Sequence, residues 1–118
     1  MSRLLFVGIA AAALCAAGSA FAQDAAKVEK GKGVYTAATP KCKTCHSIAG
    51  TGNPKGSLDD VGTKLKTADE VKAWIRTPKE SAAKAKAVRK PPMPAYSKEK
   101  ISDEDLEALT AYLLSLKK

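Results

Sequence analysis

Histidine is almost absent from this sequence, because His46 is the only one in 118 residues. Large apolar side chains are also scarce: aromatic residues make up 5% of the chain, and alanine supplies much of its hydrophobic fraction. A small domain of this kind often needs a covalent staple or a bound cofactor to complete its core. The length indicates one domain, and the composition favours a non-protein group in its interior.

The chain also lacks a convincing membrane span. Its longest apolar run, residues 4–20, is short and rich in alanine, which is typical of a secretory signal. Arg3 gives the positively charged start, and the small-x-small pattern at 20–22 is one that signal peptidases accept. We therefore expect a signal peptide at 1–22, export to the periplasm and a single domain at 23–118. An uncleaved anchor helix is the alternative for the first segment.

Strand-like alternation and internal repeats are lacking as well, whereas helical periodicity is clear. Val28, Gly31 and Tyr35 fall on one face of a helix expected over 24–38. Pro40 should end this helix, because the residue before a proline avoids the helical region.

Two further helices start at capping boxes, in which a hydroxyl residue is followed three positions later by an acidic residue. The two boxes are Thr67 with Glu70 and Ser102 with Asp105. The apolar faces of these helices carry Val71, Trp74 and Ile75 in the first, and Leu106, Leu109, Leu113 and Leu116 in the second.

The segments between these helices have other compositions. Residues 47–63 contain four glycines and a proline and should form a loop. The basic segment 79–90 is a candidate for a further helix, and PPMP at 91–94 forces an extended, stiff backbone. The expected fold is therefore all-α, with three to five helices.

The chemistry of the chain is concentrated in CKTCH at 42–46, which brings Cys42, Cys45 and His46 together. A zinc site needs four ligands, and the chain offers no further Cys/His pair downstream. A redox dithiol usually stands at a helix start in a βαβ context, which the sequence does not predict. Covalent attachment of haem c fits best, because C-x-x-C-H is its attachment signature. We expect one haem c, bound through Cys42 and Cys45, with His46 on the iron.

Met93 is the candidate for the second axial ligand of the iron. It is the sole methionine after the expected signal peptide, and Pro92 and Pro94 restrict the backbone on both sides of it. The alternative is a methionine that merely fills the core. A His/Met pair is the usual ligation of electron-transfer haems, and it leaves no open position for a substrate. We therefore expect an electron-transfer protein and not an enzyme.

With these residues the chain resembles the class I cytochromes c, small monohaem electron carriers, over 24–118. The specific motifs are CKTCH at 42–46 and Met-Pro at 93–94. Weaker support comes from Gly31 with Tyr35 and from Leu109 with Tyr112, since the first and last helices of this family cross at a glycine beside two aromatic residues. The resemblance implies thioether bonds at Cys42 and Cys45, and His46 and Met93 as axial ligands.

The sequence departs from the family pattern in two places. Many members have a proline whose carbonyl accepts the ring N–H of the proximal histidine, but the corresponding stretch here is 55–58, KGSL. The acceptor for His46 is therefore open, although a metal-bound imidazole is expected to have one. The link between Tyr35 and Cys42 also looks longer than usual, which leaves the register of the first helix open.

Several side chains are candidates for the surroundings of the haem. We expect an apolar wall of Leu58, Val61, Trp74, Ile75, Val88, Leu109 and Leu113. The indole N–H of Trp74 and the hydroxyl of Tyr96 are candidates to bind haem propionates. The alternatives are an ordinary core tryptophan and a tyrosine that only caps the pocket.

The net charge of +8 points to acidic redox protein partners. The basic residues near the ligand segments are Lys41, Lys43, Lys55, Lys79, Lys84, Lys86, Arg89 and Lys90; a generic solvated surface is the alternative. Nucleic acid is not expected as a partner, and weak contact with anionic membranes is compatible with the charge. We expect a monomeric periplasmic carrier. The alternatives are a haem subunit of a redox enzyme complex and a gas-sensing haem protein.

Overall fold

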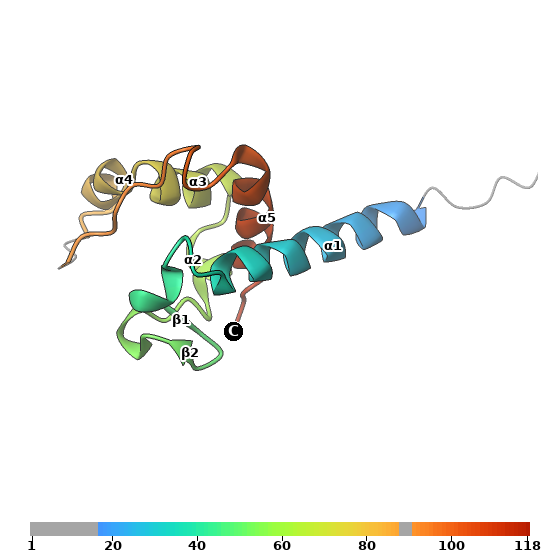
Figure 1. Ribbon diagram of the computed structural model, residues 1–118, viewed down its shortest axis with the longest axis horizontal. Helices are drawn as coiled ribbons and strands as arrows, with labels where there is room; N and C mark the ends of the chain where they lie inside the picture. Colours follow the sequence, from blue (N-terminus) through green and yellow to red (C-terminus); the bar gives the residue numbers. More distant parts are fainter. Residues whose placement is uncertain (1–16, 88–90) are drawn as a thin grey trace, which may run out of the picture.

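The computed structural model describes residues 17–87 and 91–118 (Figure 1). In these ranges the fold is all-α, as expected, with five helices: α1 (Ala17–Thr36), α2 (Val61–Lys64), α3 (Ala68–Arg76), α4 (Pro78–Lys84) and α5 (Asp103–Leu114). A two-stranded antiparallel hairpin pairs β1 (Ser47–Ile48) with β2 (Thr51–Gly52). Two short 3₁₀ turns, η1 (Cys42–Thr44) and η2 (Pro54–Gly56), flank the hairpin. Residues 1–16 of the expected signal peptide, and Val88, Arg89 and Lys90, lie outside the described residues.

Helices α1 and α5 cross at Gly31. A Cβ atom at this position would lie 2.0 Å from the carbonyl oxygen of Ala108 and 2.7 Å from Cβ of Tyr112, so only glycine allows the approach. Beside the crossing, the rings of Tyr35 and Tyr112 pack with their centroids 6.2 Å apart and an interplanar angle of 52°. The expected glycine crossing with its two aromatic residues is confirmed, and the register of the first helix is settled by it.

The expected start of the first helix was wrong. Within the described residues α1 extends back to Ala17, inside the segment expected to be a signal peptide, and the alanine-rich sequence favours this helix. It ends at Thr36, ahead of the turn that leads to Pro40. Among the described residues, no helix is long and apolar enough to span a bilayer.

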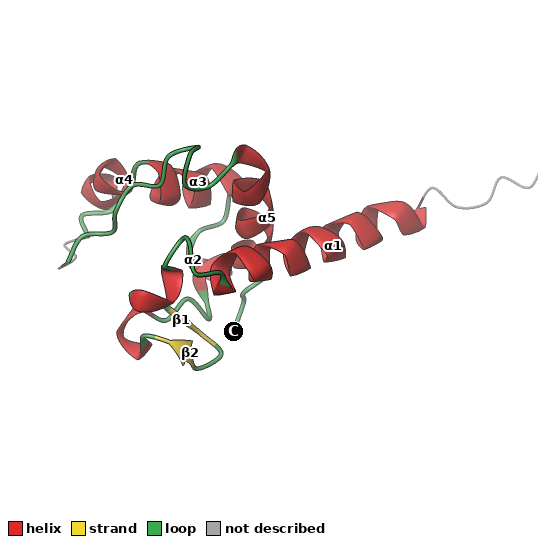
Figure 2. Cartoon of the chain, in the orientation of Figure 1, coloured by secondary structure: helices red, strands yellow, loops and turns green. Residues whose placement is uncertain are grey.

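The hydrophobic core is built around α5. Its buried members are Tyr35, Ile48, Val71, Ile75, Ile101, Leu106, Leu109, Tyr112 and Leu113. Figure 2 shows α3 and α4 along the upper side of the view and the hairpin at the lower side, with α5 and the end of α1 beside them. Tyr35, from α1, and Ile48, from β1, join this core from the two segments that flank the CKTCH motif.

Both helices start at the expected N-cap residue, and each expected capping box forms the hydrogen bond to its cap hydroxyl. The Thr67 hydroxyl accepts a hydrogen bond from the backbone N–H of Glu70 at 3.2 Å, and α3 follows. The Ser102 hydroxyl accepts from the N–H of Asp105 at 3.1 Å, and α5 follows. Each bond satisfies an N–H that has no partner inside the first turn of its helix.

The prediction of a plain loop at 47–63 was wrong in part. The segment folds into the β1–β2 hairpin, the η2 turn and the start of α2. Ala49 (φ +51°) and Gly50 (φ +81°) adopt left-handed conformations that let the hairpin turn within two residues. The 79–90 prediction is confirmed for its first part by α4, which has Pro78 in its first turn. The 91–94 segment has neither helix nor strand.

Candidate functional site

The CKTCH motif is wound into a single tight turn. The backbone N–H groups of Cys45 and His46 both donate to the carbonyl of Cys42, at 3.2 and 2.9 Å. Cys42 is half-buried and Cys45 is exposed, and both are free thiols. Burial raises the pKa of the Cys42 thiol. The turn therefore presents two thiols and an imidazole within five residues.

The ring of His46 is fixed by a backbone carbonyl. Its Nδ1 lies 3.0 Å from the carbonyl oxygen of Gly56, and because a carbonyl only accepts, Nδ1 carries the proton. This tautomer leaves the lone pair of Nε2 for a metal ion. The acceptor that the sequence left open is thus Gly56, in the stretch where other family members have proline.

Glycine is required at position 56 because the backbone approaches the motif closely. A Cβ atom on Gly56 would lie 2.0 Å from the carbonyl oxygen of Cys45 and 3.1 Å from Nδ1 of His46. A side chain here would push the η2 turn away from the motif. The absence of proline is therefore compensated by a residue small enough to bring its own carbonyl to the imidazole.

Asn53 ties the loop after the motif to the motif itself, and the sequence analysis did not identify it. Its backbone N–H lies 3.0 Å from the carbonyl oxygen of His46 and 3.1 Å from that of Lys43. Its side-chain Nδ2 donates to the carbonyl of Thr44 at 3.1 Å, while its Oδ1 accepts from the N–H of Lys55 at 3.0 Å. An asparagine between Gly52 and Pro54 signals a turn, but nothing in the sequence showed which carbonyls it would reach.

Tyr35 connects α1 to the same motif. Its hydroxyl lies 3.1 Å from the carbonyl oxygen of His46 and 3.2 Å from that of Thr51. Burial raises the pKa of the Tyr35 phenol, so the hydroxyl stays protonated and can donate. The sequence assigned Tyr35 to the helix crossing only, and the structure adds a polar contact to the backbone of the proposed ligand.

The segment that carries Met93 lies at the edge of the core. Met93 is half-buried and packs against the core, as do Cys42, Leu58 and Tyr96. Burial, together with the charges that Cys42 and Cys45 can carry, raises the pKa of the Tyr96 phenol. Tyr96 and Cys42 thus pack against the same core, although they are far apart in the sequence.

Arg76 anchors the chain beyond Met93, and the sequence analysis missed it. Its Nη1 donates to the carbonyl of Tyr96 at 3.0 Å and to that of Ile101 at 2.7 Å, and its Nη2 lies 3.1 Å from Oδ1 of Asp103. The backbone N–H of Tyr96 also donates to the carbonyl of Ile75 at 3.0 Å. An arginine at the end of an amphipathic helix gives no sequence signal for such contacts.

The remaining predicted wall residues differ in burial. Ile75, Leu109 and Leu113 are buried in the core, and Leu58 and Val61 are half-buried at its edge. Trp74 is half-buried on α3 and is not among the described side chains that pack against the core cluster. Contacts with the core in the described part of the chain therefore do not support Trp74 as a wall of the pocket, and its role stays a prediction.

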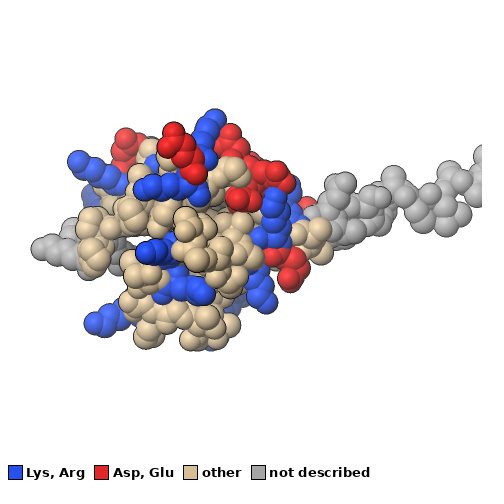
Figure 3. Space-filling model, in the orientation of Figure 1, with Lys and Arg blue, Asp and Glu red and all other residues tan. Residues whose placement is uncertain are grey.

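The basic side chains near the two ligand segments are all exposed where they are described. Lys41, Lys43, Lys55, Lys79, Lys84 and Lys86 are exposed and form no ion pair with any described residue. Other cations are paired, among them Lys30 with Glu104 and Lys72 with Glu107. In Figure 3, acidic side chains gather at the top and right, whereas basic side chains extend to the left and below.

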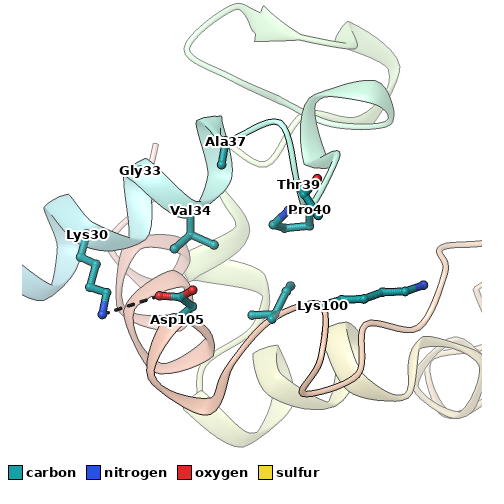
Figure 4. A pocket seen from close by; sticks show the side chains of 9 residues that line it. Lys30, Gly33, Val34, Ala37, Thr39, Pro40, Lys100 and Asp105 are labelled. Carbon is teal, nitrogen blue, oxygen red and sulfur yellow. Dashed lines mark ion pairs between the residues drawn. The ribbon is translucent and has the colours of Figure 1, made fainter.

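A surface cavity of about 260 Å³ lies elsewhere, between the last turns of α1, the loop at Pro40 and the approach to α5 (Figure 4). Val34, Ala37 and Ile101 line it together with Lys30 and Lys100. Lys30 is tied to Asp105 across it, at 3.6 Å. Neither the CKTCH motif nor Met93 lines this cavity, so it is separate from the candidate site.

The donor set suits a covalently attached haem. The turn offers two free thiols, the tautomer of His46 leaves Nε2 for iron, and Met93 supplies a thioether at the edge of the same core. Cys42, Leu58, Met93 and Tyr96 are apolar or aromatic residues left only half-buried, which is the surface that a macrocycle would cover.

Comparisons with known proteins agree with this chemistry. The sequence model of the cytochrome c family matches residues 28–117. Cytochrome c-555 of Chlorobaculum tepidum is 33% identical over 119 aligned residues, which cover 100% of both chains. Cytochrome c oxidase subunit 2 of Alkalihalophilus pseudofirmus is 40% identical over 84 residues, and the match covers 64% of this chain and 22% of that subunit. No solved structure matches the chain at a significant level.

Proposed function

This chain belongs to the cytochrome c family, and on that premise we propose that it is a monomeric, monohaem electron carrier of the periplasm with His46 and Met93 as axial ligands. The family and its relative cytochrome c-555 identify a haem c electron-transfer protein. The number of haems, the residues that hold the haem and the location of the protein belong to the proposal.

Cys42 and Cys45 are the proposed attachment points, and His46 is the proposed proximal ligand. The observation that carries this assignment is the contact of 3.0 Å between Nδ1 of His46 and the carbonyl of Gly56. It fixes the tautomer and the ring orientation, and a ligating imidazole needs both. The thiols stand on the same turn, so that thioether bonds and the iron–imidazole bond would restrain one short segment.

Met93 is the proposed distal ligand. Support comes from its half-buried position against the core that also contacts Cys42, and from the lack of another histidine in the sequence. A thioether is a weak, soft donor that favours ferrous over ferric iron and so raises the reduction potential. Burial acts in the same direction, because the ferric state carries one more positive charge.

Bound haem c supplies one-electron exchange at its iron. When haem c is bound, the residues of this chain would have three tasks: His46 and Met93 would ligate the iron, the two cysteines would fix the macrocycle, and the core residues would exclude water. Tyr96 is a proposed propionate partner because its phenol is half-buried against the core, three residues beyond Met93. Trp74 is a second proposed propionate partner, because its indole N–H is a hydrogen-bond donor.

Acidic redox proteins are the proposed donor and acceptor. The six described lysines near the ligand segments are exposed and unpaired among the described residues. Charges that are not neutralised within the molecule are available for steering an encounter with a partner of opposite sign. Increasing salt should therefore slow electron transfer to an acidic partner.

A second candidate function is that of a haem module in a redox enzyme complex. The observation that favours it is the 40% identity to a segment of an oxidase subunit. This chain spans about a fifth of that subunit's length, so only the electron-transfer module is compared. A stable monomer at high concentration would favour the free carrier, and stoichiometric co-purification with an enzyme would favour the module.

The decisive test of the ligation is a spectrum of Met93→Ala beside the wild type, both produced in a host that matures haem c. We expect the ferric wild type to show the weak far-red band of a thioether–iron bond, and Met93→Ala to lose it. Met93→His is the matched control: it should keep a low-spin iron but lack the far-red band. Identical low-spin spectra for the wild type and Met93→Ala would show that Met93 is not the ligand.

A further inference from the structure

The segment around Met93 has little structure of its own. Residues 92–97 form neither helix nor strand, and four of the five neighbours of Met93 in this stretch are exposed. Its own N-terminal side runs into proline residues, which cannot donate backbone hydrogen bonds. A weak thioether–iron bond on such a segment needs support from neighbouring elements. Without it, the form in which Met93 has left the iron (the open form) would be well populated.

Arg76 provides the side-chain hydrogen bond that the described residues make to this segment, beside the backbone bond from the N–H of Tyr96 to the carbonyl of Ile75. Its Nη1 reaches the carbonyl of Tyr96, three residues beyond Met93, and the carbonyl of Ile101 where the segment joins α5. The distances are 3.0 and 2.7 Å. The side chain is only 20% exposed, so both bonds are partly shielded from water.

We propose that Arg76 is a positioning residue: its guanidinium holds the Met93 segment closed and so limits displacement of the thioether from the iron. The inference rests on the proposed ligation by Met93. Hydrogen bonds from a charged donor are shorter and stronger than neutral ones. The planar guanidinium can serve two carbonyls and the Asp103 carboxylate at once, which the single ammonium of lysine cannot do in the same geometry.

A purely structural role for Arg76 predicts a different pattern. In that account its ion pair with Asp103 would fasten α3 to α5, and the two carbonyl contacts would be incidental. Helix α3 has a second such fastening in Lys72, whose ammonium pairs with Glu107 of α5. Lys72→Gln is therefore a matched control, because it removes one positive charge and one link between the same helices without touching the Met93 segment.

The experiment is an imidazole titration of the ferric holoprotein, followed through the far-red thioether band. Imidazole can bind only when Met93 has left the iron, so its apparent affinity is proportional to the population of the open segment. We expect Arg76→Gln to tighten apparent imidazole binding about tenfold, which corresponds to about 1.4 kcal/mol. Lys72→Gln and Asp103→Asn should stay within about twofold of the wild type, or about 0.4 kcal/mol.

Arg76→Lys keeps the positive charge and replaces Arg76→Gln in the titration if that variant does not fold. We expect Arg76→Lys to tighten apparent imidazole binding about threefold, or about 0.7 kcal/mol. Equal affinity in the wild type and both Arg76 variants would overturn the inference, as would an equal effect of Asp103→Asn. A wild type without the thioether band would overturn the proposed ligation itself, and the inference with it. If the wild type shows the thioether band but the Arg76 variants bind imidazole as the wild type does, only the inference about Arg76 is overturned.

Discussion

The two sides of the candidate haem site are held very differently. On the side of His46, the turn is tied by Tyr35 from α1, by Asn53 and by the carbonyl of Gly56. On the side of Met93, the described polar support reaches the segment only at Tyr96 and beyond, from Ile75 and Arg76. The comparison indicates a tightly held side at His46, where the protein would fix the cofactor, and a lightly held side at Met93, where the proposed bond to iron would be the one that opens.

The largest effect is expected at the proximal side, from Gly56→Ala. The new Cβ would lie 2.0 Å from the carbonyl of Cys45, so the η2 turn must move and the contact to the imidazole is lost. We expect a loss of about 3 kcal/mol in the free energy of unfolding, at the upper end for an overpacked site. Chemical denaturation of the holoprotein measures it.

Gly33→Ala is the control for that substitution. No atom lies within 4 Å of a Cβ at Gly33, which is exposed on α1. Alanine there should stabilise the helix by about 0.5–1 kcal/mol. If Gly56→Ala were as stable as this control, the close approach of the η2 turn to the motif would not exist in solution.

An intermediate effect is expected from Tyr35→Phe. The substitution removes the hydroxyl that reaches the carbonyls of His46 and Thr51 but keeps the ring that packs beside the crossing. Leaving partly buried carbonyls without this donor should lower the free energy of unfolding by about 1–2 kcal/mol.

Tyr112→Phe is the matched control, since no described residue forms a hydrogen bond with its hydroxyl. It should change stability by less than about 0.5 kcal/mol. Equal losses of stability in Tyr35→Phe and Tyr112→Phe would mean that Tyr35 acts through packing alone. Its hydroxyl would then not help to hold the turn that carries His46.

Sequence reasoning named the candidate ligands but not the residues that support them. Cys42, Cys45 and His46 are adjacent in the chain, so a spacing rule finds them. The glycine crossing was implied by the family resemblance at Gly31 and Tyr35. The imidazole of His46 and the guanidinium of Arg76 each donate to backbone carbonyls of distant segments, and backbone acceptors leave no trace in residue identity. These contacts exist only once the hairpin and α5 are in place.

The two short strands and the length of α1 were beyond sequence reasoning for another reason. A pair of two-residue strands has no periodicity to detect, and left-handed conformations at Ala49 and Gly50 decide the turn. The start of α1 was set at residue 24 by the expected signal boundary, whereas the alanine-rich sequence continues the helix back to Ala17.

The smallest effect on stability is expected from acid, through protonation of Asp103. The hydrogen bond from Lys98, and then that from Arg76, lower the pKa of Asp103 below its usual value of 3.8. Because the folded-state pKa is depressed, the stabilisation is fully present above pH 3.8 and is lost as the pH falls through the lower folded value. The Asp103 carboxylate is exposed, so its protonation should change the stability only slightly.

An acid titration of the wild type and of Asp103→Asn checks this prediction. The wild type should lose slightly more stability than the variant below pH 3.8. Parallel curves over the whole range would show that the ion pairs of Asp103 do not contribute to the stability of the fold.

The most direct measurement is a single denaturant titration of the ferric holoprotein, followed both at the thioether band and by helical circular dichroism. With His46 and Met93 as ligands and a lightly held distal side, the band should be present at the start. It should then disappear at a lower denaturant concentration than the helices, as a local opening. A protein without the band at zero denaturant, or one in which both signals vanish in a single transition, would contradict the account.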